Sequence, residues 1–183
     1  MTIPRRDGDE NLRIIGTGKY LDLVDEDGWE YVRRHRASGV VCIVATTDSG
    51  ALVLVEQPRV PVHSRTIELP AGLVGDLDDH GEPLEVAARR ELEEETGFRA
   101  ARWRFLADGP SSVGMSTEIV TFFRATGLER VGPGGGDDSE DITVHVVPMT
   151  DVVDFLTEKR SQGIPVDFKV FVALHFLSRE TPP

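Results

Sequence analysis

Hydrophobic and polar positions divide the chain into short strands, one acidic helix and two C-terminal helices. Alternating or continuous apolar runs predict nine strands, over residues 12–16, 20–24, 29–36, 39–46, 51–57, 65–69, 101–107, 119–128 and 142–147. A helical period and end signals predict helices over residues 83–96, 151–162 and 167–179. This order indicates an α+β fold, in which helices cover a mixed sheet.

Two parts of this pattern carry specific expectations. Residues 39–46 form a continuous apolar run, so we expect a central strand, with 51–57 returning as its hairpin partner. The first three strands, within 12–36, form a small antiparallel meander with limited core of its own. We therefore expect the meander to lean on the main body or on a second subunit.

The helix at 83–96 is the centre of the functional argument. At about 100° per residue its apolar stripe also contains Glu91 and Glu95, which lie one turn apart. Pro83 suits the first turn, and Gly97 suits a helix end that needs a positive φ. Buried carboxylates are uncommon unless they are paired or bind a metal. The pattern therefore favours a hard cation with oxygen ligands, Mg²⁺ or Mn²⁺, over a solvated charged face.

On a helical wheel, the other charged residues of this helix lie outside the apolar stripe. Glu85, Arg89 and Glu93 face away from the apolar stripe, as a solvated face does. Arg90 and Glu94 lie together on one flank, where they can pair with each other.

Composition narrows the function. The 183 residues carry a net charge of −12, which argues against binding of duplex nucleic acid but leaves small anionic substrates open. One cysteine, Cys42, lies within an apolar run and is expected to pack in the core, which fits a reducing compartment. We found neither a signal peptide nor a run of membrane-spanning length and expect a cytoplasmic protein.

Three loops, 72–82, 108–118 and 132–141, combine glycine and acidic or small polar residues with little apolar content. Such loops are either solvated linkers or functional segments. Within the first loop, Asp76, Asp78, His80 and Gly81 mimic the start of a calcium-binding loop. The twelfth position counted from Asp76 is Ala87, where a bidentate glutamate is needed. A calcium-stabilised structural protein is therefore disfavoured.

The segment Arg90-Glu91-Leu92-Glu93-Glu94-Glu95-Thr96-Gly97-Phe98 resembles the end of the Nudix hydrolase signature, REUxEExGU with U apolar. Glu82 stands at the required seven-residue distance before Arg90. The upstream half departs from the signature, because Asp76 stands where a glycine is usual. The residues that open the signature are Ala71-Gly72 instead, so the loop between them and Glu82 is four residues longer than usual.

Further segments resemble the ADP-ribose pyrophosphatase branch of that family. They are Val32-Arg33-Arg34-His35, Gln57-Pro58-Arg59, Glu68-Leu69-Pro70-Ala71-Gly72, the stretch from Ser112 to Glu118, and the stretch from Ser139 to Val146. The branch usually has a proline where this chain has Val113, which leaves other nucleoside diphosphate sugars open. The resemblance implies a Nudix domain over 38–183, with 1–37 as a strand extension that forms a homodimer.

The resemblance also implies roles for individual residues. Glu91, Glu95 and the backbone carbonyl of Ala71 match metal ligands, with Mg²⁺ as the expected ion and Mn²⁺ as the alternative. Glu94 matches a glutamate beside the metals, which Arg90 would orient.

In the loop 132–141, Glu140 matches a further metal contact, and the catalytic base is either Asp138 or Glu140. The substrate, a nucleoside diphosphate sugar, is expected to contact Gly114 and Met115. Arg59 and Arg65 are candidates for contacting its phosphates, with ordinary surface charge as an equal alternative.

These implications lead to Mg²⁺-dependent hydrolysis of the pyrophosphate bond of ADP-ribose to AMP and ribose 5-phosphate. Rival enzymes would act on GDP-mannose, a dinucleoside polyphosphate or a damaged nucleotide. A binding module without catalysis is disfavoured, because such modules typically lack glutamates of the signature, and all of these glutamates are present here.

Overall fold

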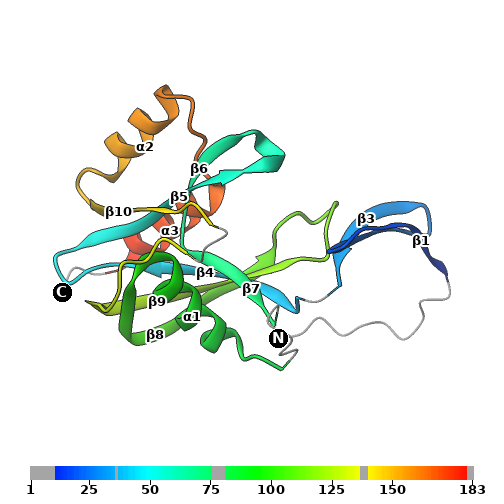
Figure 1. Cartoon of the computed structure of the whole chain (residues 1–183), viewed down its shortest axis with the longest axis horizontal. Helices are drawn as coiled ribbons and strands as arrows, with labels where there is room; N and C mark the ends of the chain where they lie inside the picture. The colour runs from blue at the N-terminus through cyan, green and yellow to red at the C-terminus, as the bar shows by residue number, and fades with distance from the viewer. Residues whose placement is uncertain (1–10, 36, 76–80, 137–139, 181–183) are drawn as a thin grey trace.

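The computed structural model describes residues 11–35, 37–75, 81–136 and 140–180. Its strands form three sheets, and helices pack against the sheets of the main body (Figure 1). The expected α+β architecture, a mixed sheet between helices with an N-terminal meander, is confirmed.

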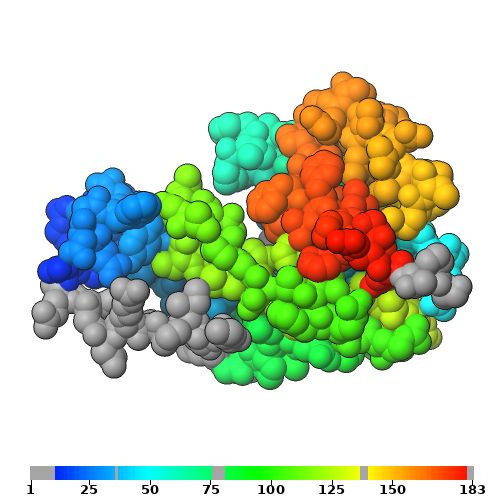
Figure 2. All heavy atoms as spheres, turned by 180° about the vertical axis from the view of Figure 1, so that it is seen from behind, coloured from blue at the N-terminus to red at the C-terminus, as the bar shows by residue number. Residues whose placement is uncertain are grey.

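The N-terminal sheet is the predicted meander. Its strands are β1 (Leu12–Thr17), β2 (Leu21–Glu26) and β3 (Trp29–Arg34), paired antiparallel in that order. The meander projects from one end of the molecule, beside the segment that precedes β9 (Figures 1 and 2). Its link to that segment runs through Val32, whose backbone N–H and C=O bond to Met115 and Thr117.

Among the described residues, the main body has two sheets that share no continuous ladder. The four-stranded sheet has the order β7-β4-β9-β8, with β4 and β9 parallel, and the three-stranded sheet has the order β10-β5-β6. Their bounds are β4 (Gly39–Ala45), β5 (Ala51–Arg59), β6 (Ser64–Glu68), β7 (Ala71–Val74), β8 (Phe98–Pro110), β9 (Ile119–Arg130) and β10 (Thr143–Pro148).

The predicted hairpin between 39–46 and 51–57 is wrong. β4 pairs with β7 and β9, whereas β5 pairs with β6 and β10, and a single bridge between Thr46 and Leu52 joins the two strands. Each of the two strands is thus an inner strand of its own sheet, and most of its side chains are buried on both faces. The predicted loop 72–82 also begins too early, because residues 72–74 continue β7.

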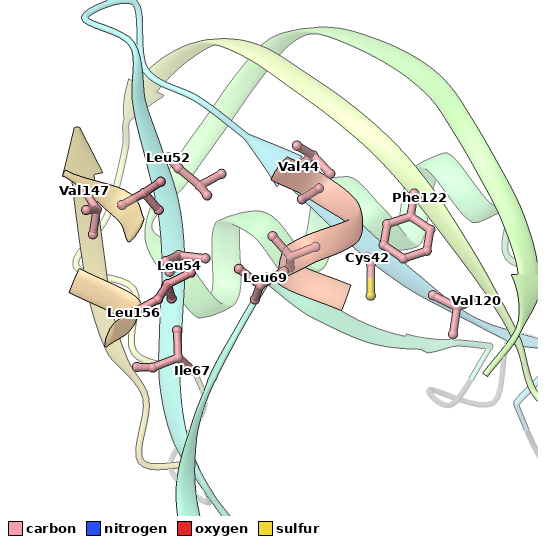
Figure 3. Close-up of a cluster of buried hydrophobic side chains, with 13 residues drawn as sticks. Cys42, Val44, Leu52, Leu54, Ile67, Leu69, Val120, Phe122, Val147 and Leu156 are labelled. Carbon is pink, nitrogen blue, oxygen red and sulfur yellow. The ribbon is translucent and has the colours of Figure 1, made fainter. Parts of the chain in front are cut away.

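Helices cover both faces of β4. The helices are α1 (Leu84–Thr96), α2 (Val152–Ser161) and α3 (Phe168–Arg179), together with the short 3₁₀ turn η2 (Val60–Val62). Val41 and Ile43 pack with α1, whereas Cys42 and Val44 pack with α3 on the opposite face (Figure 3). The alternation of side chains along one strand thus joins two cores.

Cys42 is fully buried, as predicted, and burial raises the pKa of its thiol to about 12. None of the helices among the described residues is long and apolar enough to cross a membrane.

Candidate active site

The helix α1 begins at Leu84, one residue after the predicted start, and ends at Thr96 as the sequence predicts. Pro83 precedes it with an extended backbone, and Gly97 ends it in the left-handed region at φ 71°. Glu91 and Glu95 are buried, at 9% and 3% exposure, in the same stripe as Leu92. The prediction that these two carboxylates turn toward the body of the protein is confirmed.

The two buried carboxylates lie against the start of β7. A Cβ atom at Gly72 would fall 1.9 Å from Cδ of Glu91, so a residue with a side chain would displace this carboxylate. The backbone N–H of Ala71 donates a hydrogen bond to Oε2 of Glu95 at 3.0 Å. Ala71 and Gly72 therefore form a backbone cradle for both acids.

Arg90 joins several carboxylates at the flank of α1. Its Nη1 lies 2.8 Å from Oε1 of Glu91 and 3.2 Å from Oε2 of Glu94, and its Nε donates to Glu82. Although burial lowers the pKa of Arg90, the bond with Glu82 and the charge of Glu91 raise it overall. The helical wheel pairs Arg90 with Glu94, and the structure adds a contact with Glu91, the next residue along the helix.

Glu95 carries the clearest electrostatic signal. Burial raises the pKa of its carboxyl well above the usual range, and the bond from Ala71 opposes this only in part. The negative charges of Glu91, Glu140 and Glu68 raise it further. Glu140, from the predicted loop 132–141, lies near these acids, because Gly136 bonds to the carbonyl of Glu94 and a Cβ atom at Gly136 would lie 2.2 Å from Oε2 of Glu140. This excess of negative charge favours bound cations or protons.

Glu68 is a site residue that the sequence argument did not single out. It is 4% exposed and accepts two hydrogen bonds of 2.7 Å from Arg59, as well as one from Thr66. The bond with Glu68 raises the pKa of Arg59, and the charge of Glu95 adds to this. Arg59 thus lies at the edge of the acidic cluster. The sequence signal for its pairing with Glu68 is only that the two residues lie on consecutive strands, β5 and β6.

Arg65 is held in a different network. Its Nε donates to Oε1 of Glu56 at 2.9 Å, and its Nη1 donates to Oδ2 of Asp141 at 2.6 Å. His145 and Lys159 also contact Glu56, at 3.0 and 2.7 Å. Burial opposes ionisation of Glu56, yet these partners hold its pKa at about 2. Arg65 therefore joins β6 to the segment that follows Glu140.

Gly114 and Met115 lie next to the meander, where Met115 accepts a hydrogen bond from the backbone N–H of Val32. They line a hollow of about 220 Å³ with Trp29, Tyr31 and the neighbouring residues 113–117. The indole N–H of Trp29 donates to the carbonyl of Gly114 at 3.2 Å. Asp138, the other candidate base, falls outside the described residues.

The residues around Glu95 suit a divalent metal. Glu91, Glu95, Glu140 and the carbonyl of Ala71 offer only oxygen donors, which Mg²⁺ and Mn²⁺ prefer. Within the described residues no three acidic, histidine or cysteine side chains already converge on one point. A divalent cation would offset the repulsion between these carboxylates and could draw them closer together.

The site thus consists of buried acids on one helix, cradled by backbone, with a carboxylate from a distant loop nearby, and such a set of oxygen donors suits a divalent cation. A model of the NUDIX domain matches residues 34–167. The chain therefore belongs to the Nudix family and is a Nudix hydrolase, and this family generally requires a divalent metal.

Named relatives extend the comparison. An ADP-ribose pyrophosphatase of Bacillus subtilis is 32% identical over 170 residues, which cover 89% of this chain and 88% of the relative. One from Mycobacterium tuberculosis is 41% identical over 114 residues, covering 62% of this chain and 54% of the relative. A GDP-mannose pyrophosphatase of Enterobacter sp. is 32% identical over 169 residues, covering 85% and 83%.

A solved structure described as an ADP compounds hydrolase shares the fold. It superposes with a TM-score of 0.65 over 80% of each chain, at 23% sequence identity.

The raised pKa of Glu95 yields a test of the acidic cluster. Above the usual glutamate pKa of 4.5, Glu95 ionises in the unfolded chain before it does so in the folded protein, so this residue lowers the stability of the metal-free protein as pH rises. We expect Glu95→Gln to stabilise the metal-free protein at pH 7.5 and to have no such effect at pH 4. The same variant should lose the stabilisation by Mg²⁺, which for a single site is about 2.7 kcal/mol at a hundred times Kd.

The measurement is chemical denaturation at both pH values, with and without Mg²⁺. Glu85→Gln, on the exposed face of the same helix, is the matched control and should respond to Mg²⁺ as the wild type does. Full stabilisation of Glu95→Gln by Mg²⁺ would contradict the metal site.

Proposed function

We propose that this Nudix pyrophosphatase hydrolyses the pyrophosphate bond of a nucleoside diphosphate sugar, with ADP-ribose as the leading substrate. The products would be AMP and ribose 5-phosphate. The observation that carries the proposal is the buried pair Glu91 and Glu95, to which Glu140 adds a third negative charge. The names of two relatives favour ADP-ribose, and a third relative keeps GDP-mannose as the second candidate.

The metal ligands proposed are Glu91, Glu95, Glu140 and the carbonyl of Ala71. A bound Mg²⁺ or Mn²⁺ would neutralise phosphate charge and lower the pKa of water. Arg90 holds Glu91 and Glu94 in place through charge-assisted hydrogen bonds of 2.8 and 3.2 Å. Of the proposed ligands, Glu91 is therefore already oriented before a cation binds.

Proton transfer is assigned to a carboxylate of the loop 132–141. A carboxylate beside the attacked phosphorus can take the proton of the incoming water while the bridging oxygen leaves with the other phosphate. Glu140 is the described candidate, supported by its charge effect on Glu95. Asp138 is the alternative. Glu94, exposed beside Arg90, is assigned to positioning of metal or water.

Substrate contacts are proposed for two regions. Arg59 has an exposed side chain (44%) next to the acidic cluster, so it can meet a phosphate while Glu68 holds its orientation. Arg65 is proposed as a second phosphate contact, which would compete with Glu56 and Asp141 for its N–H donors. Gly114 and Met115 are proposed for the nucleoside end, beside the aromatic ring of Trp29.

We also propose that residues 1–37 are a dimerisation extension on a Nudix domain of 38–183. The meander exposes apolar side chains on both outer strands and on β2, namely Ile14, Ile15, Leu21, Leu23 and Trp29. Such a sheet gains stability when a partner covers it.

The substrate is tested by product analysis. The protein is incubated with Mg²⁺ and, separately, ADP-ribose, GDP-mannose, a diadenosine polyphosphate and an oxidised nucleoside triphosphate. We expect AMP and ribose 5-phosphate from ADP-ribose at the highest kcat/KM. Glu95→Gln serves as the blank for contaminating enzymes. Turnover confined to GDP-mannose or to the polyphosphates would replace the leading substrate.

The dimer is tested by size-exclusion chromatography with light scattering. A chain of 20.2 kDa should elute with twice that mass at micromolar concentration. Leu23→Glu should shift the equilibrium toward monomer, because it places a charge in an apolar interface. Val153→Glu, also exposed but on α2, is the control and should leave the mass unchanged. A stable wild-type monomer would contradict the proposal.

A further inference from the structure

The C-terminal turn of α1 is capped by a segment more than thirty residues further along the chain. A helix leaves its last carbonyls without partners inside the helix. Here the carbonyl of Glu95 accepts from the N–H of Gly135 at 2.8 Å, and that of Glu94 accepts from Gly136 at 3.0 Å. The carbonyl of Gly97 accepts from Gly132 at 3.2 Å. We call residues 132–136 the glycine clamp.

The contact between the clamp and the helix is too close for side chains. A Cβ atom at Gly134 would lie 2.3 Å from the carbonyl carbon of Thr96 and 2.7 Å from the nitrogen of Gly97. A Cβ atom at Gly97 would lie 2.2 Å from the carbonyl oxygen of Gly132. These neighbours are backbone atoms, which cannot move aside as a flexible side chain can. Glycine is therefore required on both sides of this contact.

The clamp ends four residues before Glu140. A Cβ atom at Gly136 would meet Oε2 of Glu140 at 2.2 Å, so this carboxylate folds back onto the clamp. At the far side Asp141 is held by Arg65, which is itself fixed by Glu56. Glu140 thus lies between two points of attachment, one on α1 and one on β6.

We propose that the glycine clamp is a positioning element for the Nudix reaction. By bonding to the backbone of Glu94 and Glu95 themselves, it sets where the carboxylate of Glu140 stands relative to theirs. The clamp touches neither substrate nor metal and acts only through Glu140. This rests on the catalytic role proposed for Glu140.

A positioning role explains why residues 132–136 bond to the last turn of α1, which ordinary helix capping does not require. The N–H of Gly97, in its left-handed conformation, already bonds to the carbonyl of Glu93, which is a common way to end a helix. Water could satisfy the next carbonyls. A run of glycine and proline from a distant part of the chain instead reaches the turn that carries the acids.

The central experiment compares Gly134→Ala with Gly163→Ala. Both glycines have positive φ, 67° and 81°, but nothing lies within 4 Å of a Cβ atom at Gly163. The two variants therefore share the backbone strain, and only the first pushes the clamp off the helix. We expect Gly134→Ala to lower kcat by about 10- to 100-fold, with KM changed less than about threefold, since small misplacements of a reacting group cost rate. Gly163→Ala should keep the wild-type kcat.

A double-mutant cycle separates positioning from general damage. Steady-state hydrolysis of ADP-ribose is measured for wild type, Gly134→Ala, Glu140→Gln and the double variant. If the clamp acts through Glu140, Gly134→Ala should cost little further rate once Glu140 is glutamine. An equal fold-loss in both backgrounds would overturn the clamp proposal, as would a folded Gly134→Ala with wild-type kcat.

Failure of the proposed function gives a different result. If Glu140→Gln alone retains wild-type kcat, the role assigned to Glu140 is wrong and the clamp loses its target.

Should Gly134→Ala not fold, Gly135→Ala replaces it. There φ is 107° and the nearest contact of a Cβ atom is 3.8 Å away, so strain acts without a clash. A smaller loss of kcat with the same dependence on Glu140 is expected, and its absence contradicts the proposal.

Discussion

The burial of two carboxylates against the backbone of β7 is the constraint on which the rest of the site depends. Glu91 and Glu95 are nearly inaccessible to water, and the absence of a side chain at Gly72 is what lets Glu91 approach the strand so closely. Charges of one sign at such a place are unfavourable without a counter-charge. Arg90 supplies one positive charge among several acids, so the cluster as a whole remains negative.

The fold around this cluster keeps its parts in register. β4 pairs with β7 and thereby fixes Ala71 and Gly72, while its side chains alternate between the core under α1 and the core under α3. The end of α1 is tied to residues 132–136, and β6 carries Glu68 with its partner Arg59 to the same region. Separate elements thus meet at one acidic centre because backbone contacts hold each of them there.

Much of the helix could be predicted from the sequence, because apolar positions that recur every 3.6 residues indicate which side of a helix is buried. That rule placed Glu91 and Glu95 correctly, and Gly97 marked the helix end. The pairing of 39–46 with 51–57 was wrong, since periodicity identifies a buried strand but not its neighbours. The contact of Arg90 with Glu91 was missed because a long side chain is not confined to its own face. Contacts across the chain, such as that between Gly97 and Gly134, leave no local signal.

The proposed chemistry depends above all on a divalent metal held by the acids of α1. Crystals grown with Mn²⁺ and measured by anomalous diffraction test this site most directly. We predict a manganese peak at about 2.1 Å from carboxylate oxygens of Glu91 and Glu95, the metal–oxygen distance of small hard cations. A peak elsewhere, with Glu95 still bonded to the N–H of Ala71 and no ion beside it, would contradict the metal site.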